Sequence, residues 1–340
     1  MDYLQIGGED VRPLSRELTS QYDISIKKYQ YIRSSYFLDT NKGKFTLRKV
    51  DLTKEQIGFS YEVDAHLNQY HFNRLNSIYE TKKKVPYALL GDEIYVMQTY
   101  KPCEETDFKD YNDLRQTILV LAAFHKEATH VESQIRQPQE VKMKNIYEYY
   151  LKRQSENNKL KKNMITLKQK SNFEFMFLEE CDIYRELEEL ALKNIDYDLA
   201  CRLIQNVRDK KQVAHKDFTY HTVNKTPDHE YMISQLDVCN YDIQILDLAQ
   251  ILSKIMQKND WDKQILYSLI QEYDKERTIS QDEMRLLKFL MTYPDKYNSI
   301  CLKYMSSKRR WNYSMFEQKW LNMLSYREKQ IEAAHMIQTW

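Results

Sequence analysis

Residues 213–251 read VAHKDFTYHTVNKTPDHEYMISQLDVCNYDIQILDLAQI. In this stretch a short apolar strand end, VA, leads into His215, Lys216 and Asp217, and Asp237 follows a second apolar strand, YMISQL. Phosphoryl transfer needs a pair of carboxylates, because one orients the attacking hydroxyl and the other holds Mg²⁺ on the phosphates. An isolated His-x-Asp also occurs by chance, and an aspartate at a strand end is often a turn or cap residue. The interpretation therefore depends on the rest of the chain.

The composition narrows the class of protein. The chain has 340 residues, a length typical of two packed lobes. No apolar run approaches the roughly 18 residues of a membrane-spanning helix, and 51 Lys plus Arg balance 50 Asp plus Glu. A nucleic-acid or membrane partner is therefore not expected, because the chain has no net field to hold a polyanion.

Glycine and cysteine usage excludes several kinds of site. Only five glycines occur and none follows Gly91, which excludes the Rossmann and P-loop phosphate fingerprints. The five cysteines form no CxxC pair, and their odd number argues against a closed disulfide framework. No His/Cys spacing suits zinc. The N-terminus has no basic region followed by an apolar one, so we expect a protein used inside the cell that makes it.

Strand patterns in the first third predict a small sheet. Four segments have the composition of strands, at residues 29–40, 44–52, 77–84 and 86–101. A turn at 41–44 joins the first two into a hairpin, and Gly91 with Asp92 folds the last into another. Residues 54–71 have approximate helical spacing, with Thr53 as N-cap and Gln56 at N3. About five strands around one helix are expected.

Helical spacing dominates after the sheet. Helices are predicted at residues 111–129, 144–160, 174–193, 197–209, 244–257, 261–272, 281–290 and 315–337. Only 213–215 and 230–237 interrupt them as short strands, and the Lys-rich segment 159–170 is expected to be a solvated linker or helix face. The layout predicts an α+β fold with two lobes. The β-rich N-terminal lobe spans residues 1–101, and the larger, mostly helical C-terminal lobe spans residues 102–340.

Several segments together resemble a known superfamily. HKDFTYHTV, ISQLD and YDIQILDLAQIL are similar to the HGDxHxxN, hydrophobic-Asp and DLA elements of the aminoglycoside phosphotransferase and choline kinase-like superfamily. TNKGKFTLRKV resembles its glycine-containing hairpin, YEVDAHL its crossing helix, and GDEIYVMQTY with LRQTILVLAAFHKEA its linker and first long helix. Within the superfamily, the chain most resembles spore coat proteins of the CotS type from endospore-forming bacteria. The resemblance covers nearly the whole chain and implies a two-lobed protein kinase-like fold.

The resemblance also implies roles for individual residues. Asp217 corresponds to the catalytic base and Asp237 to the principal metal ligand, with ATP and Mg²⁺ as cofactors. In this fold a strand lysine pairs with the nucleotide phosphates and with a glutamate of the crossing helix. Arg48 occupies the lysine position, Lys49 lies beside it, and Glu62 is the glutamate candidate. An exposed strand charge is the alternative role for Arg48.

The strand that ends in Met97 and Thr99 would join the two lobes. The resemblance implies that backbone groups there meet an adenine, although its apolar residues are equally expected in a core. His215, Asp242 and Asp247 are expected to brace the loop rather than to react.

Three positions depart from the superfamily pattern. Thr222 stands where a metal-binding asparagine is usual, and a hydroxyl is a weaker ligand for a hard cation than an amide carbonyl. Asn224 would reach a metal only through a rearranged loop. Lys216 replaces a glycine and places a cation close to the base, and Arg48 has a planar fork in place of a compact ammonium. All three changes count against an efficient enzyme.

Two functions remain open. The first is a spore coat protein that acts mainly in assembly with other coat proteins, with weak or degenerate nucleotide binding, in other words a pseudokinase. The alternative is an ATP/Mg²⁺-dependent phosphotransferase acting on a hydroxyl of a small molecule or sugar. A protein kinase fits less well, because Cys239 replaces the glycine of the DFG motif. The resemblance implies synthesis in the cytoplasm of the mother cell and then location in the spore coat.

Overall fold

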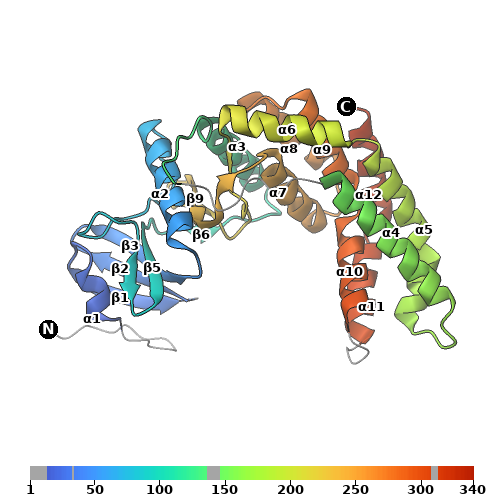
Figure 1. Cartoon of the computed structure of the whole chain (residues 1–340), viewed down its shortest axis with the longest axis horizontal. Coiled ribbons are helices and arrows are strands. Elements are labelled where there is room, and N and C mark those ends of the chain that lie inside the picture. Colours follow the sequence, from blue (N-terminus) through green and yellow to red (C-terminus); the bar gives the residue numbers. More distant parts are fainter. Residues whose placement is uncertain (1–13, 33, 136–145, 308–312) are drawn as a thin grey trace. The chain divides into compact units, whose positions relative to one another are not determined.

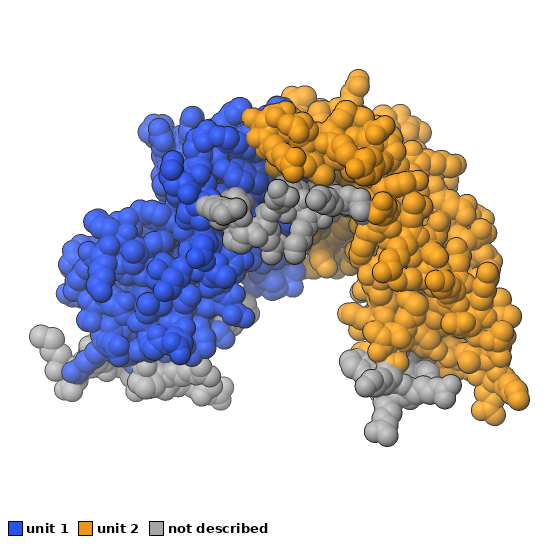
Figure 2. Space-filling model, in the orientation of Figure 1, with its two compact units in different colours: residues 1–107, 119–140, 210–244 blue, residues 108–118, 141–209, 245–340 orange. Residues whose placement is uncertain are grey.

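The structure is a computed structural model that describes residues 14–32, 34–135, 146–307 and 313–340. Contacts group the chain into two compact units (Figure 2). Unit 1 comprises residues 1–107, 119–140 and 210–244, and unit 2 comprises residues 108–118, 141–209 and 245–340. The loop that carries the two aspartates therefore groups with the β-rich first hundred residues. The lobe boundary expected at residue 101 stays a prediction.

A five-stranded antiparallel sheet forms the N-terminal part of unit 1 (Figure 1). Its strands, in chain order, are β1 Ile26–Ile32, β2 Ser35–Thr40, β3 Gly43–Val50, β4 Ala88–Leu90 and β5 Glu93–Thr99. They lie side by side in the order β1-β2-β3-β5-β4. The hairpin at Gly91 is confirmed, and this glycine has a φ of +58°. The expectation of about five strands is confirmed.

Two of the predicted strands are wrong in detail. Residues 29–40 form parts of two paired strands, because the chain reverses between Ile32 and Ser35 and these residues face each other. Ser34 takes a φ of +67° there, and no glycine or asparagine announces the turn. Residues 77–84 form no strand and contribute only an isolated bridge from Ile78 to Gln98.

Apolar clusters pack against both faces of this sheet. One cluster joins the sheet to α1 (Arg16–Ser20) and includes Leu18, Tyr22, Leu38, Leu47 and Met97. The other joins it to α2 (Lys54–Gln69) and includes Val50, Ile57, Ile78 and Val96. The predicted capping box of α2 is confirmed, since Thr53 Oγ1 accepts from Gln56 N–H and Gln56 Oε1 accepts from Thr53 N–H. Alternation along β3 places Arg48 on the α2 face.

The remainder of unit 1 contains short elements around the aspartate loop. They are β6 Glu104–Glu105, β7 Val213–Ala214, β8 Val223–Lys225, β9 Tyr231–Ile233, the 3₁₀ turn η2 Leu236–Val238 and β10 Asn240–Tyr241. β7 pairs with β10, and β6, β8 and β9 form a three-stranded sheet. The long helix α3 (Tyr111–Glu127) contributes residues to both units.

Unit 2 is built mainly from helices. These are α4 Ile146–Ile165, α5 Asn172–Leu192, α6 Tyr197–Lys210, α7 Ile245–Lys258, α8 Lys263–Glu276, α9 Gln281–Thr292, α10 Asp295–Ser306, α11 Tyr313–Leu324 and α12 Arg327–Gln338. Most lie within a few residues of the predicted helices. α10 was not predicted, and its N-cap Pro294 offers no side-chain cap. The predicted helix at 315–337 is two helices, broken at residues 325–326.

The helical core of unit 2 encloses a polar cluster. Large apolar side chains of α4, α5, α10 and α11 surround Trp320, which has no solvent exposure. Beside them Glu188 is 1% exposed and accepts hydrogen bonds from Asn157 Nδ2 and Asn298 Nδ2, each at 2.8 Å. Burial raises the pKa of Glu188 to about 7. A helix that is both long and apolar enough to span a membrane does not occur in the described part of the chain.

Candidate functional site

The loop after β7 is held by its own histidine. His215 has no solvent exposure, its Nε2 lies 3.1 Å from Ser234 O, and its Nδ1 accepts from Asp217 N–H at 3.3 Å. These contacts fix the tautomer, with the proton on Nε2. The next residue, Lys216, has a φ of +68°, a conformation that favours glycine. His215 therefore braces the loop, and the backbone keeps the glycine-like turn although a lysine stands there.

Asp217 presents its carboxylate to solvent. The residue is exposed, and its side chain has no hydrogen-bond partner among the residues that the structure describes. Its main chain, in contrast, is fixed, because Thr222 Oγ1 lies 2.9 Å from Asp217 O. A carboxylate on a fixed backbone can accept the proton of a hydroxyl that approaches from solvent.

The buried hydroxyl of Thr222 forms hydrogen bonds with the backbone of the same loop. The residue is 1% exposed, and its hydroxyl accepts from Thr219 N–H at 2.9 Å while lying within 3.0 Å of the carbonyls of Asp217 and Thr219. A hydroxyl has one proton and two acceptor lone pairs, so these contacts use most of its capacity. Thr222 is oriented into its own loop rather than toward an open coordination site.

Asp237 forms an ion pair with Arg48. The side chains are 11% and 16% exposed, and Arg48 Nη2 donates to Asp237 Oδ2. Burial lowers the pKa of Arg48 to about 10, still far above neutrality, so the guanidinium stays charged. The contact joins β3 to η2 within unit 1. The predicted nucleotide-binding cation and the predicted metal ligand thus pair with each other.

The turn that carries Asp237 is anchored to α2. Ser60 Oγ donates to Leu236 O at 2.9 Å, and Gln235 enters the turn with a φ of +64°. Ser60 is 1% exposed, so this bond is protected from water. The helix therefore positions the Asp237 carboxylate through the backbone of the preceding residue.

Glu62 has partners other than Arg48. Ser133 Oγ donates to Glu62 Oε2, and Gln134 N–H lies 3.4 Å from Glu62 Oε1. The segment around Ser133 lies close to α2, because a Cβ added to Gly58 would come within 2.4 Å of Ile135 Cδ1. Glycine inside this helix permits that close approach. The structure does not bring Glu62 together with Arg48 as the resemblance implies.

The other residues predicted to bind a nucleotide are engaged elsewhere. Lys49 is exposed and pairs with Glu93. Met97 has its side chain in the sheet core, and its carbonyl accepts from Tyr79 N–H at 2.8 Å. Thr99 donates its N–H to Ser77 O and accepts from Ser77 N–H, both at 2.8 Å. Their roles in nucleotide binding stay predictions.

Lys216 and Asp242 form a second ion pair in the loop. Lys216 Nζ donates to Asp242, whose other carboxylate oxygen accepts from Ile243 N–H at 2.8 Å. Asp242 is 7% exposed in its side chain, whereas Lys216 is 42% exposed. The lysine at the glycine position is therefore turned to a neighbouring acid. Asp247, expected to brace the loop, lies buried in the first turn of α7.

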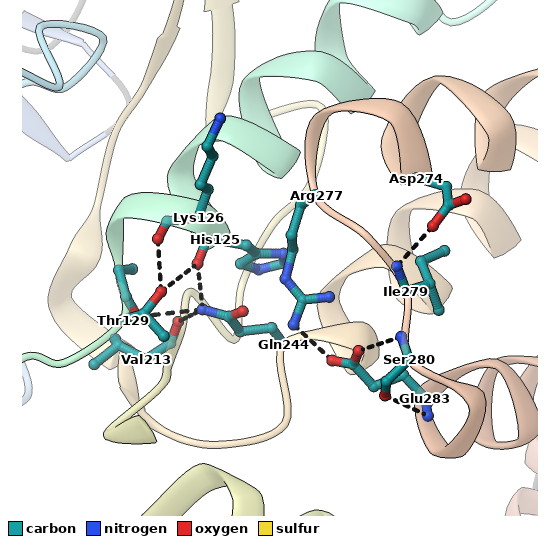
Figure 3. A network of polar contacts seen from close by, with 11 residues as sticks. His125, Lys126, Thr129, Val213, Gln244, Asp274, Arg277, Ile279, Ser280 and Glu283 are labelled. Atoms are coloured by element: carbon teal, nitrogen blue, oxygen red, sulfur yellow. Dashed lines mark hydrogen bonds and ion pairs between the residues drawn. The ribbon is translucent and has the colours of Figure 1, made fainter. Parts of the chain in front are cut away.

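Gln244 ties the end of α3 to β7 (Figure 3). Its Nε2 lies 2.8 Å from His125 O, 3.2 Å from Ala128 O and 3.1 Å from Val213 O. The residue has no solvent exposure. Carbonyls at the last turn of a helix have no partner within the helix, and this amide supplies one. The strand that leads into His215 is thereby fixed.

The oxygen donors around Asp237 are engaged with other groups of the protein. Mg²⁺ requires oxygen ligands that are free to bind it. Asp237 is paired with Arg48, Thr222 is satisfied inside its loop, and Asn224 lies in β8 opposite Met232. Among the described residues no group of three or more His, Cys, Asp or Glu could hold a metal ion. The metal roles of Asp237 and Thr222 stay predictions.

A comparison with known protein families shows which family this chain belongs to. The family described as "Spore coat putative kinase YutH" matches residues 15–336. The chain belongs to this family. The predicted likeness to spore coat proteins of the CotS type is confirmed. No curated protein matches the sequence of this YutH-family chain.

Solved structures similar to the YutH-family chain include several phosphotransferases. An aminoglycoside phosphotransferase from Alicyclobacillus acidocaldarius subsp. acidocaldarius DSM 446 has a TM-score of 0.85 at 16% identity, with 98% of each chain covered. Spectinomycin phosphotransferase APH(9)-Ia, in complex with ADP and spectinomycin, has a TM-score of 0.60 at 14% identity, with 95% of this chain and 99% of that chain covered. Amicoumacin kinase hAmiN, in complex with AMP-PNP and Ca²⁺, has a TM-score of 0.54 at 12% identity, with 93% of this chain and 92% of that chain covered. These likenesses confirm the predicted kinase-like fold.

Sequence reasoning on the YutH-family chain missed two supports of the loop. Ser60 lies in a predicted helix with no feature that marks it, and Gln244 was predicted only as the first residue of a helix. Gly58 did carry a signal, because a glycine inside a helix commonly marks a close approach.

Proposed function

We propose that this protein acts in the spore coat as an assembly component whose kinase-like site does not transfer phosphate. The observation that carries the proposal is the ion pair between Arg48 and Asp237. It uses the carboxylate that metal-dependent phosphotransferases keep for their cation. Other coat proteins are the proposed partners, and synthesis in the mother cell followed by deposition in the coat is the proposed route.

The other altered positions support the same proposal. Thr222 cannot replace an asparagine carbonyl while its hydroxyl is bonded inside the loop. Lys216 places a cation directly before Asp217 and pairs with Asp242. Both arrangements stabilise the loop by themselves, without a bound nucleotide. A loop whose polar groups are bonded within the protein suits a protein that acts through surface contacts with other coat proteins rather than through catalysis.

An active phosphotransferase is the second candidate, and one observation favours it. The Asp217 carboxylate is exposed and has no partner among the described residues, as an acceptor-orienting group requires. The neighbours solved with ADP and with AMP-PNP show that related folds bind nucleotides. In this candidate Asp217 would orient a hydroxyl of a small molecule or sugar.

Nucleotide binding separates the two candidates. Thermal unfolding and calorimetry would be measured with millimolar ATP, with excess Mg²⁺ or with a chelator. We expect no Mg²⁺-dependent rise in Tm, because a ligand stabilises only the state that binds it. Asp237→Ala tests the metal ligand, and Asp228→Ala, an exposed aspartate of the β8–β9 turn, is the matched control. A Mg²⁺-dependent rise that only Asp237→Ala abolishes would remove the observation that carries the first candidate and would favour the second.

Location tests the assembly role. A tagged protein should appear during sporulation and remain with purified spore coats. If the tagged protein were made in growing cells and absent from spores, the assembly proposal would fail whatever the nucleotide result.

A further inference from the structure

A groove of about 510 Å³ lies in unit 2 between α4 and α10. Its apolar lining residues are Leu160, Met164, Leu167, Tyr304, Met305 and Phe316. Methionine side chains are flexible and adapt to the shape of a partner. The volume lies within the range of pockets that hold a small molecule, so the groove can take up one large side chain. The proposed function leaves this groove unused.

The side of the groove that α4 forms carries positive charge. Lys152, Lys159 and Asn163 are exposed, and their separations of seven and four residues place them on one face of the helix. Lys159 and Asn163 line the groove itself. Neither lysine has an ion-pair partner among the described residues. Glu156, also in the lining, is paired with Arg153 at 2.9 Å, so its charge is already balanced.

The neighbouring helix α5 carries the opposite charge (Figure 1). It contains seven acids and one arginine, whereas α4 contains five basic residues and two glutamates. Phe175, Glu179 and Glu186 are exposed, and separations of four and seven residues place them on one face of α5. Neither glutamate has an ion-pair partner among the described residues. Asp182 lies on the same face and pairs with Lys161.

Phe175 is the aromatic residue of this acidic face. It is 56% exposed, and no other phenylalanine in the described part of the chain is exposed. Single exposed apolar residues are common on protein surfaces. Here, however, the phenylalanine continues a stripe of unpaired carboxylates, and aromatic side chains that enter a pocket are the usual anchors of protein interfaces. The stripe therefore has the composition of one half of an interface.

The two stripes match in spacing. In α5 the two glutamates follow Phe175 by four and eleven residues, and in α4 the two lysines precede Asn163 by four and eleven residues. At a rise of 1.5 Å per residue, these separations are about 6 and 16 Å in both helices. A second α5 laid antiparallel along α4, with Phe175 at Asn163, therefore brings each glutamate to a lysine. A crossing angle of about 20° shifts the far pair sideways by roughly 6 Å, which a long lysine side chain can span.

We propose that a second copy of this chain docks its α5 along α4, with Phe175 in the groove between α4 and α10. The partner is a second copy because the surface that complements the groove in shape and in charge lies on the same chain. The contact joins two different surfaces, so it can continue from copy to copy unless its geometry closes. The inference goes beyond the proposed function, because it concerns unit 2 alone and does not depend on where the protein is located.

Sedimentation equilibrium of the full chain, without nucleotide, tests self-association. The average mass of the wild type should rise above that of the monomer between micromolar and millimolar concentrations. Phe175→Ala should weaken this association about tenfold or more, because it removes the aromatic anchor. Tyr70→Ala, in unit 1, removes an aromatic residue that is 54% exposed and should leave the association unchanged. Thermal unfolding of each variant verifies that it is folded.

Exchange of charge tests the register of the two helices. Lys159→Glu and Glu179→Lys should each weaken self-association about tenfold, because each places like charges opposite each other. A mixture of these two variants should associate about as tightly as the wild type, because every contact between unlike copies again pairs opposite charges. Arg208→Glu and Asp228→Lys reverse exposed charges elsewhere and should leave the association unchanged.

Three results would overturn the proposal. The first is a wild-type chain that stays monomeric over the whole concentration range, which would leave the groove to a different protein. The second is self-association that Phe175→Ala, Lys159→Glu and Glu179→Lys change no more than their controls do. The third is a mixture of the two charge variants that associates no better than either variant alone. None of these results bears on nucleotide binding near Asp237 or on location in the coat, so the two proposals fail separately.

Discussion

Two buried acids, Asp237 in unit 1 and Glu188 in unit 2, are held in opposite ways. In unit 1, Asp237 lies against the guanidinium of Arg48, so a buried charge faces an opposite charge. In unit 2, Glu188 receives only the amides of Asn157 and Asn298, and burial raises its pKa to about 7. The first arrangement keeps a charged pair in the interior, and the second places a carboxyl close to neutrality there.

Some uncharged groups of the two units also differ in how they are bonded. The Thr222 hydroxyl in unit 1 is bonded on all sides by its own loop, whereas Trp261 Nε1 and Tyr293 Oη in unit 2 have no partner among the described residues. In the site identified by resemblance, the Thr222 hydroxyl is fully engaged, whereas Arg48 Nε is buried without a partner among the described residues. Buried polar atoms without a partner among the described residues therefore occur in both units, and the motif residues are not exempt.

Removing the acid of unit 1 has the largest expected effect. Asp237→Ala leaves Arg48 charged and buried, and should lower the free energy of unfolding by about 3–5 kcal/mol in urea denaturation. Asp228→Ala should change it by less than about 0.5 kcal/mol. The double variant Arg48→Met with Asp237→Leu should recover most of the loss. Equal stability of Asp237→Ala and wild type would show that the pair is not the carboxylate's main role.

Removing the charge of Glu188 in unit 2 should change how the free energy of unfolding depends on pH. The pKa of Glu188 rises from 4.5 to about 7 on folding, so the native state binds the extra proton between these values. The free energy of unfolding should therefore fall as pH rises from about 4.5 to 7, by roughly 3 kcal/mol in total. Glu188→Gln keeps an oxygen for both asparagines and should remove this slope. Glu189→Gln, its exposed neighbour, should keep it, and identical slopes would contradict the assignment.

The internal bonding of Thr222 is the next test. Thr222→Val keeps the shape but deprives Thr219 N–H of its acceptor, and should cost about 1–3 kcal/mol. Chemical denaturation of the purified variant measures it. A loss below about 0.5 kcal/mol would mean that the loop does not depend on this hydroxyl, and the contrast between the units would weaken.

The smallest expected effect concerns the unmet hydroxyl of unit 2. Tyr293→Phe removes a buried group that has no partner, so the free energy of unfolding without ligand should stay equal or rise by up to about 1 kcal/mol. Thermal unfolding without added ligand would show this. A loss of more than about 1 kcal/mol would reveal an internal hydrogen-bond partner for this hydroxyl.

Local signals account for the parts of the fold that the sequence predicts. Thr53 with Gln56 marks the start of α2, and Gly91 marks the last hairpin of the sheet. The reversal at Ser34 lacks such a signal, because a serine takes the left-handed conformation there. The start of α10 was missed for a similar reason, since Pro294 provides no side-chain cap. Elements whose ends depend on tertiary packing are the ones that pattern alone does not predict.

The candidate site, too, has residues that the sequence singles out and contacts that it does not predict. Asp217 and Asp237 could be singled out because both follow short apolar strands in one stretch of sequence. The partner of Asp237 could not, because Arg48 lies 189 residues away and only the folded chain brings it near. Residue identity predicts which groups can react, but contact decides what each group is already bonded to.

The hydrogen bonds of Gln244 affect how the protein unfolds locally. One side-chain amide bonds carbonyls at the end of α3 and in β7, and Val213 N–H donates to Ala128 O at 2.9 Å, so separating the two segments breaks both links. The two segments should therefore unfold as one cooperative unit. In hydrogen exchange, amides around Ala128 and Val213 would show a single opening free energy, although 85 residues of chain, by their numbering, separate them.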